Sequence, residues 1–137
     1  MISALLIHGV PIECINRAAI TYFVPAKVII SVLETENGKN GQAKPNKNGT
    51  IDYGVMQINS VWLKKIEHYG YNAKMIQYNP CANVAVGTWI LSQRIADKQN
   101  IWSGIGNYHS YTPNLSANYQ LNVSHKLEQI NKITQIT

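Results

Sequence analysis

The chain has 137 residues, of which 45% are hydrophobic and 14% are charged, as expected for one globular domain over residues 1–137 and not for a disordered chain. Twelve basic and seven acidic residues give a net charge of +5, but no arginine-rich stripe or nucleic-acid-binding motif occurs, so a nucleic-acid partner is not expected. The longest apolar runs, of about seven residues, are too short to span a bilayer.

The chain begins with an apolar segment, Met1–Ile7, which lacks a basic region and a convincing cleavage site before Ile12 and so predicts a signal peptide poorly. We expect residues 1–10 to be a signal remnant or N-terminal extension at a truncated or misassigned start, or a helix packed on the core. A first helix is predicted over residues 13–23. Its apolar face holds Ile15, Ala18, Ala19 and Tyr22.

A second helix is predicted from Pro25, which suits a first helical turn, to Glu36. Its apolar stripe holds Val28, Ile29, Val32 and Leu33. Glu36 continues this stripe, whereas Glu34 lies on a polar side with Lys27 and Ser31, either of which is its expected partner. Because the two glutamates are two residues apart, they point about 200° apart around the axis and cannot act as a pair.

The position of Glu36 at the end of an apolar stripe has two interpretations. In the first, the carboxylate is partly desolvated at the rim of a cleft, which would raise its pKa and suit a general acid at neutral pH. In the second, it is a helix-end glutamate that turns to solvent beside Gly38, the predicted C-cap. The pattern alone leaves both open.

A polar loop rich in asparagine, glycine and lysine is predicted over residues 37–50. Its lysines Lys39, Lys44 and Lys47 favour an anionic polymer as partner, although a role of the positive charge in solubility would explain it equally well. Residues 51–59 predict a short extended segment, in which a glycine allows close backbone approach and Gln57 supplies an amide that both donates and accepts.

The next helix is predicted over residues 60–69, between a serine cap and a terminating glycine. Its Trp62 is either a core residue or a platform for a sugar. Another helix is predicted over about residues 80–98, with Asn79 as its cap and proline in its first turn. Asn83 lies on or beside the apolar face of that helix, either as a local cap or as a functional polar group.

Residues 100–113 predict a glycine-containing segment whose Tyr108 either anchors a loop or belongs to a site. Asn114 is predicted to cap a last helix. The apolar stripe of that helix consists of Leu115, Tyr119, Val123, Leu127, Ile130 and Ile133 or Thr134. The sequence contains no internal repeat and no linker that would divide the domain.

The two cysteines, Cys14 and Cys81, have no metal-ligand spacing around them, and the four histidines form no i,i+4 pair. No metal site and no cofactor are therefore predicted. An even cysteine count predicts one long-range disulfide in a protein of the cell envelope, or two buried free thiols in a cytosolic one. The residues themselves leave both alternatives open.

Four short runs, in a fixed order, carry a resemblance to a known family. They are Glu36-Asn37-Gly38, Asn48-Gly49-Thr50-Ile51-Asp52-Tyr53-Gly54-Val55-Met56-Gln57-Ile58-Asn59, Asn79-Pro80-Cys81-Ala82-Asn83-Val84, and Asn107-Tyr108-His109-Ser110 with Thr112-Pro113. Over about residues 14–120, the chain resembles the family 1 lytic transglycosylases, especially the subgroup that accompanies type IV secretion, conjugation and pilus machinery. It departs from the family pattern at Asn37, Val55 and His109-Ser110, none of which removes a proton-transfer group.

The resemblance implies a mainly α, lysozyme-like domain with a short extended segment beside its cleft. It also implies peptidoglycan as substrate, a periplasmic or cell-envelope location in a bacterium, and type IV secretion or pilus components as partners. Glu36 would protonate the glycosidic oxygen between N-acetylmuramic acid and N-acetylglucosamine. It would then take the proton of the muramoyl 6-hydroxyl as that oxygen closes on C1, leaving a 1,6-anhydro product. We expect a monomer with no membrane span.

The resemblance also implies the other site residues. Tyr108 would hydrogen-bond near Glu36 and the developing oxocarbenium ion, and Asn83 would hold sugar substituents. The remaining expected substrate-binding residues are Tyr53, Met56, Gln57, Asn59 and His109. Cys14 and Cys81 would form a disulfide, because the subgroup tends to place cysteines at both positions.

Two other functions stay open at this point. One is a hydrolase on the same scaffold, resembling goose-type lysozyme, and the other is a glycan-binding or assembly module of a secretion channel. Hydrolysis needs a second carboxylate roughly 5 to 9.5 Å from the acid, and Asp52 is the sole credible candidate among the seven acidic residues. The alternative role of Asp52 is bonding within a turn. Without a second carboxylate, the 6-hydroxyl of the substrate is the natural nucleophile.

Overall fold

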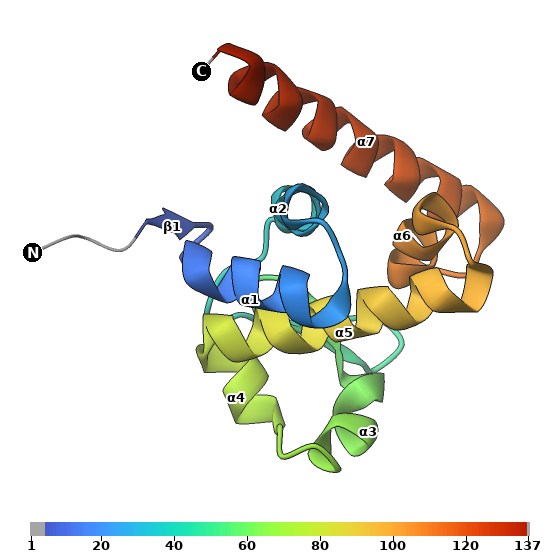
Figure 1. Cartoon of the computed structure of the whole chain (residues 1–137). Coiled ribbons are helices and arrows are strands. Elements are labelled where there is room, and N and C mark those ends of the chain that lie inside the picture. The colour runs from blue at the N-terminus through green and yellow to red at the C-terminus, as the bar shows by residue number, and fades with distance from the viewer. Residues whose placement is uncertain (1–4, 137) are drawn as a thin grey trace, which may run out of the picture.

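Seven α-helices, one short 3-10 helix and two small antiparallel sheets make up residues 5–136, which the computed structural model describes (Figure 1). The helices are α1 (Ile12–Tyr22), α2 (Ala26–Glu36), η1 (Ser60–Trp62), α3 (Leu63–Glu67), α4 (Ala73–Tyr78), α5 (Pro80–Lys98), α6 (Ile101–His109) and α7 (Pro113–Ile136). The strands are β1 (Leu6–Ile7), β2 (Val10–Pro11), β3 (Ala43–Pro45), β4 (Ile51–Tyr53) and β5 (Ile58–Asn59).

Helix α5 runs through the middle of the fold, with α1, α4 and α6 packed against it, while α7 lies across α2 and α6 (Figure 1). A hydrophobic core fills the space between these elements. Its largest fully buried side chains include Ile15, Ile29, Leu33, Met56, Ile58, Ile66, Ile76, Leu91 and Ile105. Burial of each such side chain stabilises the fold by about 1.5 to 3 kcal/mol. The described residues thus form one compact, mainly α unit, as predicted.

Helices α1 and α2 agree with the predicted bounds to within one residue. The predicted apolar face of α2 is buried, whereas that of α1 is buried at Ile15 and Ala18 and partly buried at Ala19 and Tyr22. The predicted C-cap of α2 is wrong. Asn37 is the left-handed cap, with φ of 50°, and its N–H donates to the carbonyl of Leu33 at 2.9 Å. Gly38 follows with its backbone against the carbonyl of Gly54, where a Cβ would have no room. Close approach of the loop to the sheet therefore explains this glycine.

The sequence pattern does not predict helices α4 and α6. Residues 100–113 were expected as a glycine-containing segment, because glycine has a low helix propensity. In the structure, Gly104 lies against the backbone of Ile95 and Gly106 against the side chain of Ser116, with no space for a Cβ at either glycine. Close packing of α6 on α5 and α7 therefore outweighs the local propensity. The helix predicted over residues 60–69 is present as η1 and α3 and ends two residues earlier.

Helix α7 begins one residue before its predicted cap. The predicted stripe is buried or partly buried in its middle, at Tyr119, Val123, Leu127 and Ile130. It is wrong at its ends, because Leu115 is 49% exposed and Ile133 is 64% exposed. The side chain of Thr134 lies outside the described residues. Ser116, which was not part of the predicted stripe, is buried beside Gly106.

The N-terminal segment forms a small hairpin, in which β1 pairs with β2 and Leu6 lies opposite Pro11. The alternative of a core-packed helix is therefore wrong for Leu6–Ile7, and Met1–Ala4 lie outside the described residues. None of the helices within residues 5–136 combines the length and the apolar character that a membrane span requires. Helices α1 and α2 reach that length and composition only as a pair bent by 120°.

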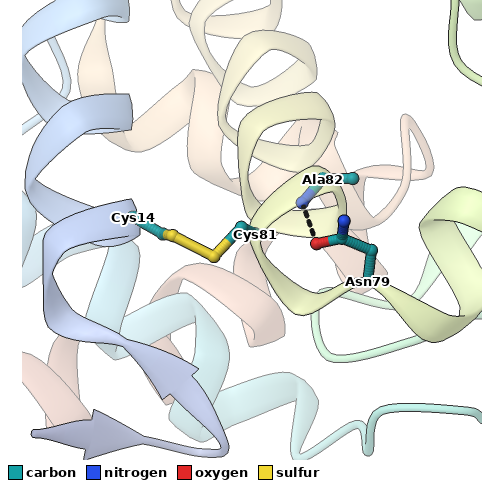
Figure 2. The surroundings of a disulfide bond; sticks show 4 residues. All are labelled: Cys14, Asn79, Cys81 and Ala82. Atoms are coloured by element: carbon teal, nitrogen blue, oxygen red, sulfur yellow. Dashed lines mark hydrogen bonds between the residues drawn. A yellow bond between two sulfur atoms is a disulfide. The ribbon is translucent and has the colours of Figure 1, made fainter. Parts of the chain in front are cut away.

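A disulfide between Cys14 and Cys81 joins α1 to the first turn of α5 (Figure 2). The two Cα atoms are 5.4 Å apart, and 67 residues separate the cysteines in sequence. Beside the bridge, the Asn79 side chain accepts a hydrogen bond from the N–H of Ala82 at 3.1 Å (Figure 2). The cap predicted from sequence therefore sets the start of α5 next to the covalent link.

Candidate active site

A cleft of about 580 Å³ is lined by the end of α2, the β3–β5 sheet, η1, α5 and the end of α6. The polar side chains of the sheet and its loops in this cleft are Lys44, Asn46, Asn48, Thr50, Asp52, Gln57 and Asn59. Those from η1 onward include Trp62, Arg94, Asn107, Tyr108, His109, Ser110 and Tyr111. The cleft is therefore rich in amide, hydroxyl and aromatic groups, the side chains that hydrogen-bond to and stack on sugars.

Strands β4 and β5 of this sheet lie within the extended segment predicted over residues 51–59, whereas β3 comes from the asparagine-rich segment that was predicted as loop. Strand β3 pairs with β4, with Lys44 opposite Asp52, and β4 pairs with β5, with Asp52 opposite Asn59. The β3–β4 turn closes through the N–H of Asn46, which donates to the carbonyl of Thr50 at 2.8 Å. These pairings place alternate polar residues on the cleft, because side chains of a strand point to opposite faces in turn.

Glu36 is the last residue of α2 and lines the cleft. Its Oε2 accepts a hydrogen bond from the hydroxyl of Tyr119 at 2.7 Å. Burial raises the pKa of Glu36 to about 7. The negative charge of Asp52 acts in the same direction, while the bond from Tyr119 and the charge of Lys44 oppose the rise. A carboxyl with this pKa can both donate and accept a proton near neutral pH.

The contacts of the two α2 glutamates confirm that they point to different sides. Nε2 of His8 lies 3.0 Å from Oε1 of Glu34, so the partner of Glu34 comes from the N-terminal hairpin rather than the expected polar side of α2. Ser31, predicted on that polar side, is fully buried, and its hydroxyl donates to the backbone carbonyl of Lys27 at 2.7 Å. The helical phase was therefore predicted correctly, but the neighbours of Glu34 were not.

Tyr119 is a site residue that the sequence did not indicate, because it occupies a position in the apolar stripe of α7. Its ring stacks on His109, with ring centroids 4.7 Å apart and planes at 5°. Burial and the charge of Glu36 raise the pKa of Tyr119 well above its usual value, so its hydroxyl stays protonated and donates. Burial lowers the pKa of His109, which favours the neutral imidazole. The sequence feature that could have indicated this role is the hydroxyl of a tyrosine within an otherwise apolar stripe.

Tyr108 lines the cleft at the end of α6, and its hydroxyl donates to the backbone carbonyl of Met56 at 2.8 Å. Burial, with the charges of Glu36 and Asp52, raises the pKa of Tyr108 well above its usual value. The charge of Glu36 therefore acts on Tyr108. The hydrogen bond from the Tyr108 hydroxyl connects α6 to the segment before β5.

Asn83, expected to hold sugar substituents, lies behind the cleft and is 1% exposed. Its Oδ1 accepts from the N–H of Met56 at 2.9 Å, and its Nδ2 donates to the carbonyls of Tyr53 and Ile76 at 2.8 and 2.7 Å. The side chains of Tyr53 and Met56 are also buried and do not line the cleft. Gly54, with φ of +67°, has no room for a Cβ beside Asn83. These residues shape the cleft wall from within.

Gln57 and Asn59 line the cleft as expected, and both are held by neighbouring groups. Nε2 of Gln57 donates to the carbonyl of Gly54 at 2.8 Å and to Oε1 of Gln42 at 3.0 Å. Nδ2 of Asn59 donates to Oδ1 of Asp52 at 3.0 Å. Across residues 5–136, no group of three His, Cys, Asp or Glu side chains is placed to hold a metal ion.

Both alternatives for Trp62 stay open, because its ring has a packing partner and also faces the cleft. It lines the cleft and also packs edge-on against Trp89, with ring centroids 5.9 Å apart. The guanidinium of Arg94 lies 4.7 Å from the centroid of the Trp62 ring and 5.0 Å from that of Tyr111. No sequence pattern indicated that Arg94 and Tyr111 belong to the cleft, because the two residues come from different elements.

The family model described as transglycosylase SLT domain matches residues 13–130. Protein IpgF of Shigella flexneri is 31% identical over 101 residues, which cover 73% of this chain and 66% of that protein. Invasion protein IagB of Salmonella typhimurium is 29% identical over 101 residues, with 73% and 63% covered. A peptidoglycan-binding-like protein of Escherichia coli O157:H7 is 27% identical over 106 residues, with 71% and 63% covered. The matches thus span slightly less than two thirds of each of these relatives.

The family model covers most of the chain and includes the α2 glutamate, the sheet, α5 and α6, which together form the cleft. The same stretch holds all four runs on which the resemblance rests. The chain therefore belongs to the transglycosylase SLT domain family.

Proposed function

We propose that this chain is a lytic transglycosylase that cleaves the β-1,4 bond between N-acetylmuramic acid and N-acetylglucosamine in peptidoglycan. The observation that carries the proposal is the carboxyl of Glu36, which lines the cleft, accepts a bond from Tyr119 at 2.7 Å and has a pKa of about 7. Membership of the SLT family supports peptidoglycan as the substrate class. The amide-rich and aromatic lining of the cleft supports a glycan as ligand.

In the first half of the reaction, protonated Glu36 gives its proton to the glycosidic oxygen as the bond from that oxygen to C1 breaks. Because Oε2 accepts from Tyr119, Oε1 is the oxygen that carries the proton. N-acetylglucosamine leaves with a new 4-hydroxyl, and an oxocarbenium ion develops at C1 of the muramoyl residue. The carboxylate of Asp52, which lines the same cleft, lowers the energy of that cation.

In the second half, the Glu36 carboxylate takes the proton of the muramoyl 6-hydroxyl while that oxygen bonds to C1. The hydrogen bond from Tyr119 stabilises this anionic form of Glu36. Glu36 ends the cycle protonated, and no water is consumed. The product therefore ends in 1,6-anhydromuramic acid.

The remaining residues divide into two groups by their position. We assign substrate contact to Gln57, Asn59 and His109, whose side chains line the cleft. Tyr108 holds the Met56 backbone in place through its 2.8 Å hydrogen bond. Asn83, Met56 and Tyr53 support the cleft wall from its buried side. The amide of Asn83 does so through hydrogen bonds to backbone groups.

Hydrolysis, as in goose-type lysozyme, is the second candidate, and the position of Asp52 in the cleft favours it. A water-activating or nucleophilic carboxylate must be free to reach C1 or a water molecule. Oδ1 of Asp52 already accepts from Asn59 at 3.0 Å within the sheet, which supports a role in holding β4 and β5. A pure glycan-binding module would not require an enclosed acid with a raised pKa.

Purified peptidoglycan sacculi test the reaction. Soluble products are analysed by mass spectrometry with and without borohydride, which reduces only sugars with a reducing end. We expect products lighter than hydrolysis products by one water molecule and inert to borohydride. Reducible products, together with loss of activity in Asp52→Asn, would assign the chain to the hydrolases. Binding without products would leave only the glycan-binding function.

We also propose that the enzyme opens the cell wall locally for a secretion, conjugation or pilus apparatus. One relative, IagB, is named an invasion protein, and the motif resemblance is to transglycosylases that accompany such machinery. The bridge between Cys14 and Cys81 supports a location in the periplasm or cell envelope, because disulfides persist in oxidising compartments. Complementation of a deletion mutant by wild type, but not by Glu36→Gln, in a substrate-transfer assay would test this role.

A further inference from the structure

Arg94 occupies an unusual position in the cleft. It comes from α5, whereas the two rings nearest its guanidinium, Trp62 and Tyr111, come from η1 and the α6–α7 connection. The distances from Cζ to the ring centroids are 4.7 and 5.0 Å, and all three side chains line the cleft. Such cation–π contacts fix the plane of a guanidinium and leave the N–H groups at its edge as donors.

The ion pair of Arg94 leaves most of these donors unused. Among the residues that the structure describes, its carboxylate partner is Asp97, with Nη1 and Oδ2 3.4 Å apart. Asp97 is 60% exposed, whereas the Arg94 side chain is 18% exposed, so water weakens the pair. A guanidinium carries five N–H donors and accepts a carboxylate through two parallel bonds. Arg94 can therefore bind a second carboxylate.

The cleft is lined by both acidic and basic side chains. Glu36 and Asp52 are its acidic residues, and Lys44 and Arg94 are its lysine and arginine. The charge of Lys44 acts on Glu36, whose pKa it lowers. An acidic substituent of a bound strand would be repelled by the carboxylate of Asp52, and by Glu36 when it is ionised. It would be attracted to Arg94, which the aromatic rings hold in a fixed orientation.

We propose that Arg94, held by Trp62 and Tyr111, is a binding residue for a carboxylate carried by the glycan strand. The proposal rests on the proposed function and specifies what the cleft recognises beyond the sugar rings. Two groups on a peptidoglycan strand share this chemistry. They are the carboxylates of the stem peptide and the lactyl carboxylate that is freed when the peptide is removed.

The test measures binding by titration calorimetry in the Glu36→Gln background, so that no strand is cleaved. Three probes of matched length separate the sources: strands with stem peptides, strands stripped by an amidase, and neutral chitin oligosaccharides without the lactyl group. Arg94→Gln removes the charge, and Arg94→Lys keeps it without the planar fork. Arg17→Gln is the matched control, because Arg17 is the other arginine of the chain and lines a separate hollow between α1 and α5.

We expect Arg94→Gln to weaken binding of at least one acidic strand about ten-fold, the usual effect of losing a hydrogen bond to a charged group. Chitin oligosaccharide binding should not change, and Arg94→Lys should restore part of the affinity. Loss confined to peptide-bearing strands identifies the stem peptide, and loss confined to stripped strands identifies the lactyl group. Arg17→Gln should leave all three affinities unchanged.

Two results would overturn the proposal while leaving the proposed function intact. One is unchanged binding of both acidic strands by Arg94→Gln. The other is equal weakening of all three probes, which would make Arg94 a packing residue for Trp62 and Tyr111. Absence of binding to every probe by the Arg94-containing protein would instead overturn the proposed function as well.

Discussion

Two hollows lie beside the C-terminal end of α2, and each receives one glutamate from that helix. The active-site cleft, with Glu36, has a volume of about 580 Å³, and the polar hollow, with Glu34, has about 600 Å³. Helix α7 contributes to both surroundings, through the Tyr119 hydroxyl bound to Glu36 and through His125 in the polar hollow. Size and the presence of a carboxylate therefore do not distinguish them.

The two hollows differ in how far water is removed from the carboxylate. Glu34 is 39% exposed and pairs with His8 at 3.0 Å. Glu36 is enclosed, and burial is the main reason that its pKa rises to about 7. Two residues of helix thus separate an ordinary surface glutamate from a candidate general acid, because the 3.6-residue period turns one of them toward the interior.

The largest expected effect tests this difference directly. Glu36→Gln should lower the rate of peptidoglycan cleavage by about 10² to 10⁴, the usual contribution of an acid–base group. Glu34→Gln is the matched control and should keep most of the activity, because its side chain lies in the polar hollow. Rates are measured from release of soluble products from sacculi. Equal losses in the two variants would mean that Glu36 and Glu34 do not differ in their role.

A second test concerns the disulfide, which stabilises the fold but lies outside both hollows. Replacing Cys14 and Cys81 by serine should lower the free energy of unfolding by about 4 kcal/mol, because the bridge closes a long loop in the unfolded chain. Denaturant titration measures this change. Neither cysteine lines either hollow, so activity per folded molecule should persist. Two free thiols in the alkylated, unreduced wild type would contradict the bridge itself.

A third test uses the dependence of stability on pH. The pKa of Glu36 rises from an ordinary 4.5 to about 7 on folding, so the folded state disfavours the anion. Below pH 4.5 the carboxyl is protonated in both states, and burial of the charge costs nothing. As pH rises toward 7, wild type should lose about 3 kcal/mol relative to Glu36→Gln. Unfolding curves at pH 4 and pH 8 measure the difference, and a constant difference would argue against the raised pKa.

The smallest expected effect concerns Tyr119. Its hydrogen bond lowers the pKa of Glu36, so Tyr119→Phe should raise that pKa further and move the alkaline limb of the pH–rate profile upward by about one unit. Tyr78→Phe, on the exposed side of α4, is the control and should not move the profile. A downward shift in Tyr119→Phe would mean that the phenol does not stabilise the carboxylate.

Elements whose structure follows from neighbouring residues in the sequence were predicted, whereas elements that depend on distant residues were not. Helices α1, α2 and α5 follow from apolar period and capping residues, as does the separation of Glu34 from Glu36. Helix α6 was missed because Gly104 and Gly106 are explained only by the neighbours against which they pack. Partners distant in sequence, such as His8 for Glu34, carry no local pattern.

The same limit applies to the candidate site. The motif resemblance indicated Glu36 and Tyr108, and both line the cleft. It could not show that the amide of Asn83 is engaged by backbone groups 27 and 30 residues away. Tyr119 was predicted as an apolar contact, because the polarity of its hydroxyl matters only once α7 lies across α2. Tertiary packing decides these roles.

Direct titration of Glu36 tests whether its enclosure in the cleft makes this residue the acid. Carbon-13 NMR of the side-chain carboxyls follows each glutamate with pH, and the signal missing in Glu36→Gln identifies Glu36. We predict that this signal titrates with a pKa of about 7. Titration at the ordinary value of 4.5 would contradict the role of Glu36 as general acid, because the carboxyl would then be ionised at neutral pH and could not protonate the glycosidic oxygen.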